Sequence, residues 1–208
     1  MPGDSDNILY RVSNLKADDS SRDIYDDWAE DYDRHLKRDF GYLSPQVAAT
    51  ELAAIVDRTD AEIMDYGCGT GLVGEALRKK GFSHIDGIDV STGMLEQAGA
   101  KKVYRELVCA DLTGSIPLAD ETYDAALCIG SMGAGHVGAQ HVAEMLRPIR
   151  RGGAFVIILN GSYYQSGGFE AGFRGIEQAE LWSIRKLEEF NYMSELDRPG
   201  WLLVAKRR

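Results

Sequence analysis

The sequence is poor in cysteine and in long apolar segments. Its three cysteines, Cys68, Cys109 and Cys128, are odd in number and lack both CxxC spacing and metal-ligand pairing, which indicates a reduced, cytoplasmic setting. The longest uninterrupted apolar run, residues 154–159, is far shorter than the ~20 residues of a membrane-spanning helix. The first residues are polar and acidic rather than basic and then apolar, so we expect neither a signal peptide nor a membrane partner.

Positive charge is scarce as well. The chain has 23 Lys and Arg residues against 33 Asp and Glu residues, a formal net charge of −10. Binding to a phosphate backbone depends on clustered Lys and Arg, so we do not expect a nucleic acid as the main partner. A small molecule or a basic protein fits better. Because His35, His84 and His141 show no metal-ligand spacing, we also expect no metal site.

A strand, a glycine loop and a helix are predicted in succession near residue 65. Residues 62–66 form a short apolar run that breaks into three glycines at alternate positions, Gly67, Gly69 and Gly71. Residues 72–80 then carry apolar side chains at helical spacing and end in basic residues, as the C-terminus of a helix prefers. Glycines let a backbone approach a ligand closely and place amide donors at a helix N-terminus. This order favours a ligand site over a plain glycine-rich turn.

The charge of that ligand depends on Asp65, which lies at the end of the predicted strand. A carboxylate there would repel a pyrophosphate and attract an amine or a sulfonium. A P-loop is excluded because Glu75 occupies the lysine position. Gly69, Gly71 and Gly74 do match the dinucleotide pattern G-x-G-x-x-G, so an NAD-dependent oxidoreductase is an alternative. Against it, the first of these glycines does not directly follow the strand.

Two further predicted strands end in acids. The strand within residues 82–90 ends at Asp89, about twenty residues past the glycine loop, where a doubly wound fold places a carboxylate for the ribose hydroxyls. The strand at residues 107–110 ends at Asp111. Carboxylates that gather at one sheet edge repel one another, so a ligand with several donors explains them better than packing does.

We predict one α/β domain, with a doubly wound, mostly parallel seven-stranded sheet, helices on both faces and a C-terminal antiparallel strand. Residues 1–20 are expected to form a flexible arm, and residues 21–208 the domain. Its start, residues 21–58, is predicted to be a helical lid with an aromatic face; the alternative is a helix that only covers the domain edge. The remaining elements are predicted as a strand at 123–130, a helix near 141–146, a strand at 154–159, a loop at 161–168, a helix at 169–181, and an antiparallel hairpin of strands at 183–192 and 201–206.

These residues resemble class I methyltransferases that use S-adenosylmethionine. The resemblance rests on the motif Asp65-x-Gly67-x-Gly69-Thr70-Gly71, the strand-end Asp89, the triplet Ala110-Asp111-Leu112 and the closing hairpin. More narrowly, Tyr25-x-x-Trp28-Ala29-x-x-Tyr32-Asp33, Gly69-Thr70-Gly71-Leu72-Val73 and Gly93-Met94-Leu95-Glu96-Gln97-Ala98 are similar to the methyltransferase-like proteins named after the Williams–Beuren chromosomal region.

The resemblance implies S-adenosylmethionine as the cofactor and S-adenosylhomocysteine as the product. It implies that the backbone of Gly67, Cys68 and Gly69 faces the methionine moiety, and that Asp65 lies near its ammonium group directly or through water. Asp89 is expected to hold the ribose.

The same resemblance assigns the rest of the cofactor site. Val90 and Met94 are expected to flank the adenine, while Asp111 accepts from its amino group beside the amide of Leu112. The expected pocket floor consists of Cys128, Ile129 and Gly130. The expected lid residues are Tyr25, Trp28 and Tyr32.

The sequence gives little information about the methyl acceptor. Ile129-Gly130-Ser131-Met132 stands where many amino-group methyltransferases have Asn/Asp-Pro-Pro-Tyr/Phe, and there is no Pro-Cys nucleophile. His136 is a candidate general base, although it could also be an exposed turn histidine. Further substrate-side candidates are Asn160, Tyr163 and Tyr164. We therefore expect an enzyme that methylates a small molecule or a protein by in-line displacement; the alternative is a non-catalytic cofactor-binding subunit.

Overall fold

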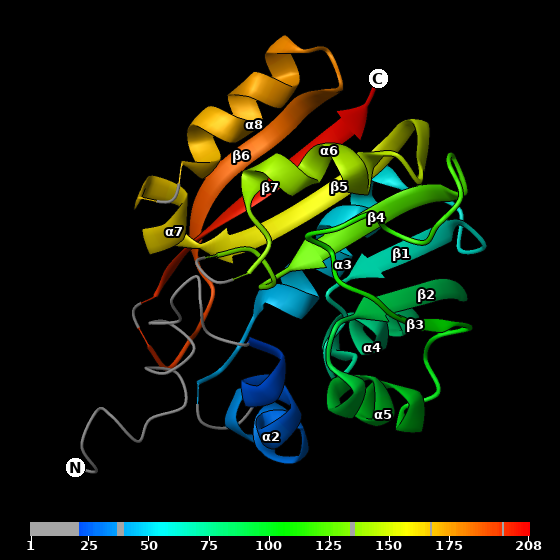
Figure 1. Cartoon of the computed structure of the whole chain (residues 1–208), viewed down its shortest axis with the longest axis vertical. Helices are drawn as coiled ribbons and strands as arrows, with labels where there is room; N and C mark the ends of the chain where they lie inside the picture. The colour runs from blue at the N-terminus through cyan, green and yellow to red at the C-terminus, as the bar shows by residue number, and fades with distance from the viewer. Residues whose placement is uncertain (1–20, 37–39, 134–135, 167, 197) are drawn as a thin grey trace.

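The computed structural model describes residues 21–36, 40–133, 136–166, 168–196 and 198–208 (Figure 1). The predicted N-terminal arm, residues 1–20, lies outside this part of the chain. Among the described residues, no helix is long and apolar enough to cross a bilayer, and no group of His, Cys, Asp and Glu side chains could hold a metal ion.

Seven strands form one sheet in the order β3-β2-β1-β4-β5-β7-β6. Their bounds are β1 (Glu62–Tyr66), β2 (His84–Asp89), β3 (Leu107–Cys109), β4 (Tyr123–Ile129), β5 (Ile149–Asn160), β6 (Trp182–Asn191) and β7 (Pro199–Arg207). The pairs from β3 through β5 are parallel, whereas β7 is antiparallel to both β5 and β6. This topology confirms the predicted mostly parallel sheet with its antiparallel final strand.

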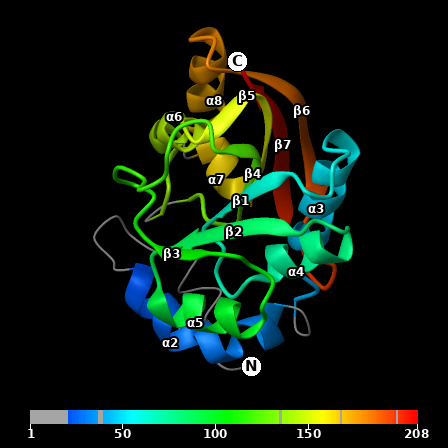
Figure 2. The same ribbon diagram turned by 90° about the vertical axis from the view of Figure 1, so that its right-hand side faces the viewer.

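Helices cover both faces of the sheet, as predicted. In Figure 2, α6 (Val142–Leu146), α7 (Gly161–Ser166) and α8 (Phe169–Gln178) lie on one side of the sheet. On the other side lie α3 (Ser44–Ile55) and α4 (Leu72–Lys79). The remaining helices, α2 (Ser21–Arg34) and α5 (Thr92–Ala100), pack against each other at the end of the molecule.

Strand pleating explains these two apolar layers. Successive side chains of a strand point to opposite faces, so Phe155 and Ile157 of β5 belong to the core under α6 and α8, while Val156 and Ile158 belong to the core under α3 and α4. The apolar run at residues 154–159 of β5 contributes to both layers, as expected of a strand that is buried on both faces.

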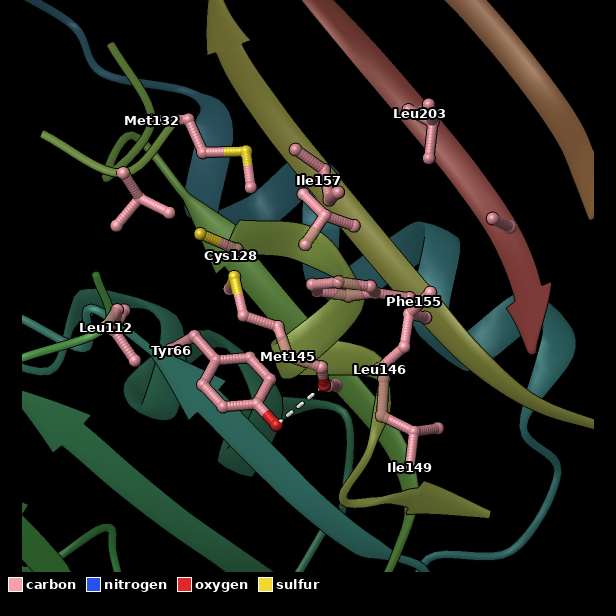
Figure 3. Close-up of a cluster of buried hydrophobic side chains, with 14 of the residues drawn as sticks. Tyr66, Leu112, Cys128, Met132, Met145, Leu146, Ile149, Phe155, Ile157 and Leu203 are labelled. Atoms are coloured by element: carbon pink, nitrogen blue, oxygen red, sulfur yellow. Dashed lines mark hydrogen bonds between the residues drawn. The ribbon is translucent and has the colours of Figure 1, made fainter. Parts of the chain in front are cut away.

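Tyr66 connects β1 with both β5 and α6 in the core beneath α6 and α8 (Figure 3). The rings of Tyr66 and Phe155 meet edge to face with centroids 6.0 Å apart. The Tyr66 hydroxyl donates a 2.9 Å hydrogen bond to the Met145 carbonyl, so this buried phenol is satisfied. The end of β1, which precedes the glycine loop, is thereby fixed against β5 and α6.

Two segments differ from the sequence-based prediction. Residues 161–168 were predicted as a loop, but residues 161–166 form helix α7. The reason is tertiary packing: Tyr164 stacks on Trp201 of β7 with ring centroids 4.2 Å apart, and Gly161 lies against the backbone of Pro199. Strand β5 also begins earlier than predicted, at Ile149, with a register shift opposite β4.

The central layer gives a stability prediction. Replacing the fully buried Phe155 with Ala removes the ring that packs on Tyr66 and leaves a cavity. We expect a loss of about 3–5 kcal/mol in the free energy of unfolding, measured by urea denaturation. The matched control is Leu181→Ala, because Leu181 is 44% exposed and its truncation should change stability by less than about 0.5 kcal/mol. Similar losses for both variants would contradict this assignment of the core.

Candidate functional site

A cavity of about 490 Å³ opens at the carboxyl ends of the parallel strands. It lies where the chain order of the sheet reverses between β1 and β4, which is where doubly wound folds bind ligands. Most of the predicted site residues line it: Tyr25, Tyr32, Gly67, Cys68, Gly69, Asp89, Val90, Met94, Asp111, Leu112, Ile129, Gly130 and His136. The acids that follow successive strands are thus brought to one cavity edge.

The glycine loop forms one wall through its backbone. Gly67, Gly69 and Gly71 all have positive φ angles, of 68°, 52° and 91°, a conformation that side chains disfavour. A Cβ on Gly67 would also collide with the hydroxyl of Ser131, whereas none would be obstructed at Gly69. The loop requires glycine chiefly for its backbone conformation and leaves open space beside Gly69.

Asp89 braces the glycine loop from the end of β2. One carboxylate oxygen accepts from the Gly69 amide at 2.8 Å, and the other accepts from the Ser91 amide at 2.9 Å. Burial raises the pKa of Asp89, and the amide donors act against that rise. Each oxygen has a second lone pair, so the carboxylate can accept further hydrogen bonds at the cavity wall.

Asp111 is held by its own turn at the other side of the cavity. Its Oδ1 accepts from both the amide and the hydroxyl of Thr113, each at 2.8 Å. This Asx-type turn fixes the carboxylate beside Leu112 without using a charged partner.

Asp65 lies behind the cavity wall and is fully buried. Its Oδ2 accepts from the hydroxyl of Tyr104 at 2.7 Å, while its Oδ1 makes no hydrogen bond with any described part of the chain. Burial raises the pKa of Asp65 to about 7, and the Tyr104 hydrogen bond opposes this effect. The carboxylate is therefore half satisfied, next to the loop that lines the cavity.

Tyr104 also accounts for the dinucleotide-like spacing of the glycines. A Cβ on Gly74 would lie 2.6 Å from the Tyr104 ring, and one on Gly71 would lie 3.0 Å from it. The Tyr104 hydroxyl accepts from the Gly74 amide at 3.2 Å. Gly71 and Gly74 therefore make room for an aromatic ring of the protein itself.

Helix α2 covers the cavity and is anchored at two points. Asp26 accepts from the Ser91 hydroxyl and from the Gly93 amide, the latter at 2.9 Å. Asp33 accepts from the Thr70 hydroxyl and pairs with Lys101, both at 2.5 Å. The helix contributes Tyr25 and Tyr32 to the wall. Trp28 belongs to the same helix, but its side chain is outside what the structure describes.

Four predicted site residues lie elsewhere. Cys128 is fully buried and belongs to the core beside Tyr66, because the pleat that turns Ile129 one way turns Cys128 the other. Asn160 donates to the Tyr192 hydroxyl at 3.2 Å. Tyr164 is buried in its stack on Trp201, and Tyr163 packs against Gly133. None of the four is among the described cavity-lining residues.

His136 does line the cavity. Its ring lies 5.7 Å from that of Tyr25, at an interplanar angle of 51°. Burial lowers its pKa below the usual value, so the imidazole is neutral at neutral pH. No Lys or Arg belongs to the described cavity wall, and Asp89 and Asp111 are its charged side chains.

Sequence reasoning missed several wall residues that come from distant segments. Tyr42 and Pro45 precede or begin α3, and Ser131 and Val137 follow β4. Thr70, Leu72, Val73 and Ala110 also line the cavity, and these four did stand within the quoted motifs. The others carry no local pattern, because only the tertiary fold brings them to the cavity.

Comparison with known proteins identifies the family. A family described as a methyltransferase domain matches residues 64–157. The chain is 35% identical over 165 residues to methyltransferase-like protein 27 of Homo sapiens, an alignment that covers 76% of this chain and 66% of that protein. The chain belongs to the class I S-adenosylmethionine-dependent methyltransferases. The human relative also confirms the narrower resemblance to the Williams–Beuren-region proteins.

Other relatives of this methyltransferase differ in the acceptors that they are named for. It is 31% identical over 136 residues to malonyl-(acyl-carrier protein) O-methyltransferase of Pseudescherichia vulneris, covering 64% of this chain and 51% of that one. It is 32% identical over 84 residues to the 18S rRNA (guanine-N(7))-methyltransferase of Bos taurus, covering 40% and 30%. The chain thus spans about two thirds of the human relative's length and about half or less of the other two.

A solved structure supports the fold of the methyltransferase. A chain in the complex between the Trm112 methyltransferase activator and a methyltransferase of Haloferax volcanii superposes with a TM-score of 0.69 at 18% identity. The superposition covers 90% of this chain and 99% of that chain.

The cavity of this methyltransferase fits the family's cofactor in its charge. S-adenosylmethionine carries a sulfonium, an ammonium and two ribose hydroxyls, which a wall with Asp89 and Asp111 but without described cations attracts rather than repels. The half-satisfied Asp65 adds an acceptor behind the loop. Together with family membership, the packing of Tyr104 at Gly71 and Gly74 argues against the NAD-dependent oxidoreductase alternative.

The fit of the Tyr104 ring gives a prediction. Gly74→Ala should lower the free energy of unfolding by about 1–3 kcal/mol, because the added methyl overlaps both the Tyr104 ring and the Val103 side chain, which would have to shift. The matched control is Gly175→Ala in α8, where nothing lies within 4 Å of the added Cβ. This control should raise stability by about 0.5–1 kcal/mol, the usual gain of alanine in a helix. Thermal unfolding measures both, and a stabilised Gly74→Ala variant would refute the proposed packing.

Proposed function

We propose that this protein transfers a methyl group from S-adenosylmethionine to a neutral small molecule or to a protein side chain. The observation that carries the proposal is the cavity at the switch point between β1 and β4, with acids but no described cations in its wall. A binding site of this charge suits a cationic cofactor and a neutral acceptor. It suits a phosphate backbone poorly.

The cofactor roles follow from the positions in the cavity wall. We assign the ribose hydroxyls to Asp89, whose two bound amides keep its carboxylate in place. The adenine amino group is assigned to Asp111, beside the Leu112 amide, with Val90 and Met94 on the two sides of the ring. Tyr25, Trp28 and Tyr32 of α2 are assigned to the lid.

The methionine end is assigned to the glycine loop. Gly67, Cys68 and Gly69 line the cavity with little side-chain bulk. Asp65 stands two residues before Gly67, with one carboxylate oxygen available. We assign the ammonium group to this oxygen, directly or through a water molecule.

The catalytic contribution of the chain is positioning and proton transfer. When bound, the cofactor supplies a methyl group that its sulfonium has already activated for in-line displacement. Holding an acceptor ~3 Å from that methyl, in a cavity from which α2 excludes water, supplies much of the acceleration. The ring of His136 is assigned as the general base, because a neutral imidazole at the cavity wall can take the proton that an attacking hydroxyl or amine releases.

The acceptor can be identified by a transfer assay. The protein would be incubated with cofactor labelled in its methyl group and with separate panels of metabolites, peptides and RNA. Label in a metabolite or a peptide would support the proposal, while label only in RNA would refute the assigned acceptor class. Saturable cofactor binding without transfer to any panel would instead support the non-catalytic subunit.

The Asp89 assignment predicts a specific loss of binding. Asp89→Ala should weaken the binding of S-adenosylhomocysteine by roughly 1–3 kcal/mol, because hydrogen-bond donors on the ligand and on the glycine loop lose their acceptor. Calorimetric titration measures the change. Asp60→Ala is the control, because Asp60 is exposed and precedes β1 at the opposite edge of the sheet. Unchanged affinity of Asp89→Ala would count against the ribose contact, and saturable binding of NAD alone would overturn the cofactor assignment.

The base assignment predicts a pH profile. Because burial lowers the pKa of His136, the unprotonated base persists below the usual pKa of a histidine, and kcat should fall only at a pH below about 6.5. His136→Asn should lower kcat by about 10²–10⁴ and leave S-adenosylhomocysteine affinity unchanged. The control is His84→Asn, since His84 pairs with Glu62 at the start of β2, away from the cavity. A normal kcat for His136→Asn would refute the assignment of His136 as the general base.

A further inference from the structure

Tyr104 lies in the connection between α5 and β3, outside the set of residues that line the cavity. Its hydroxyl nevertheless reaches beneath the glycine loop, where it donates to Asp65 and accepts from the Gly74 amide, at 2.7 and 3.2 Å. Its ring fills the space that Gly71 and Gly74 leave open. One side chain therefore contacts both the loop and the carboxylate behind it.

Tyr104 is the hydrogen-bond donor to the Asp65 side chain within the described part of the chain. The other carboxylate oxygen, Oδ1, is buried and has no partner there. None of the titratable groups that influence Asp65 from the surrounding elements is a cation. They are Tyr42 before α3, Cys68 in the glycine loop, Asp89 on β2, Tyr104 before β3, and Cys128 on β4. Without a neighbouring cation, the charge on Asp65 depends on this one hydroxyl.

We propose that Tyr104 is a positioning residue for the cofactor: its hydroxyl holds Oδ2 of Asp65, so that the unpaired Oδ1 is oriented to take the ammonium group of the methionine moiety. This inference rests on the proposed function, because it assumes that the methionine end lies at the glycine loop. Tyr104 itself does not belong to the described cavity wall.

The pH dependence of binding follows from the sign of the Asp65 shift. Burial raises its pKa to about 7, so Asp65 ionises as the pH rises through neutrality, and affinity for an ammonium ligand rises with it. The Tyr104 hydrogen bond lowers that pKa. Removing the hydroxyl therefore moves the midpoint of the binding curve to higher pH.

The raised pKa of Asp65 also lowers the stability of the ligand-free protein as the pH rises. The folded protein binds a proton that the unfolded chain releases between the two pKa values, so stability declines from about pH 4 to about pH 7. The neutral side chain of Asp65→Asn lacks this decline, and its melting temperature should improve relative to the wild type as the pH rises. A bound ammonium group stabilises the ionised form and reverses the disadvantage.

Tyr104→Phe tests the inference, because phenylalanine keeps the ring at Gly71 and Gly74 and deletes only the hydroxyl. Two ligands would be titrated by calorimetry from about pH 6 to about pH 8: S-adenosylhomocysteine, and 5′-methylthioadenosine, which has the nucleoside and thioether but no ammonium group. We expect the affinity of Tyr104→Phe for S-adenosylhomocysteine to fall about tenfold near pH 7 and less at higher pH. Its affinity for 5′-methylthioadenosine should not change.

Two further variants sharpen the comparison. Asp65→Asn should lose S-adenosylhomocysteine affinity at every pH, and the double variant with Tyr104→Phe should lose no more, since both changes act on one contact. The matched control is Tyr123→Phe, whose hydroxyl bonds Asp86 at 3.2 Å at the start of β4. This control should bind both ligands as the wild type does.

Three results separate the possible failures. Wild-type affinity of Tyr104→Phe for S-adenosylhomocysteine at every pH would overturn the inference. Equal losses of affinity for both ligands would also overturn it, because they would indicate a purely structural role of the hydroxyl. Failure of the wild type to bind either ligand would instead overturn the proposed cofactor site. If Tyr104→Phe does not fold, carboxyl-carbon NMR on the wild type decides: the pKa of Asp65 should lie near 7 and fall when S-adenosylhomocysteine binds, and an unshifted value would overturn the inference.

Discussion

The carboxylate of Asp89 is the interaction on which the site depends. It binds one backbone amide of the glycine loop and one from the turn into α5, so two loops that follow different strands are held at a fixed separation. The positive φ angles of the loop glycines are maintained by this bond and by the Ile88 carbonyl, which accepts from the amides of Gly67 and Cys68. The shape of the cavity is therefore set mainly by backbone donors, as suits a site that must accept a fixed ligand outline.

The site combines this rigid frame with unbalanced charge. Asp65 and Asp89 repel each other across the loop, and burial disfavours both charges. Elsewhere the protein neutralises its buried acids: Asp86, equally well buried, is paired with Arg105. This contrast supports the proposed cationic ligand, which would neutralise Asp65 and Asp89; without it, their burial lowers the stability of the free protein.

The sequence predicts those parts of the fold that are encoded locally. The strand-end acids and the glycine loop could be placed because parallel strands bring their carboxyl ends to one edge regardless of what packs around them. The contacts of Tyr104, Asp26 and Asp33 could not be predicted, since each of these side chains binds residues that are distant in sequence. Helix α7 was missed because a stack on Trp201 outweighs the weak helical tendency of its glycine and serine residues. Cys128, predicted beside Ile129, lies in the core because successive side chains of a strand point to opposite faces, and the sequence pattern of a fully buried strand does not show which face is which.

The double anchoring of α2 has a consequence for turnover. Asp26 caps the same helix, α5, that contributes Met94 to the cavity, and Asp33 holds Thr70 within the loop. With the cofactor bound as proposed, its product would lie beneath α2, and its release would require these bonds between three separate segments to break. In the proposed catalytic cycle, release of the product rather than the chemical step would then limit turnover.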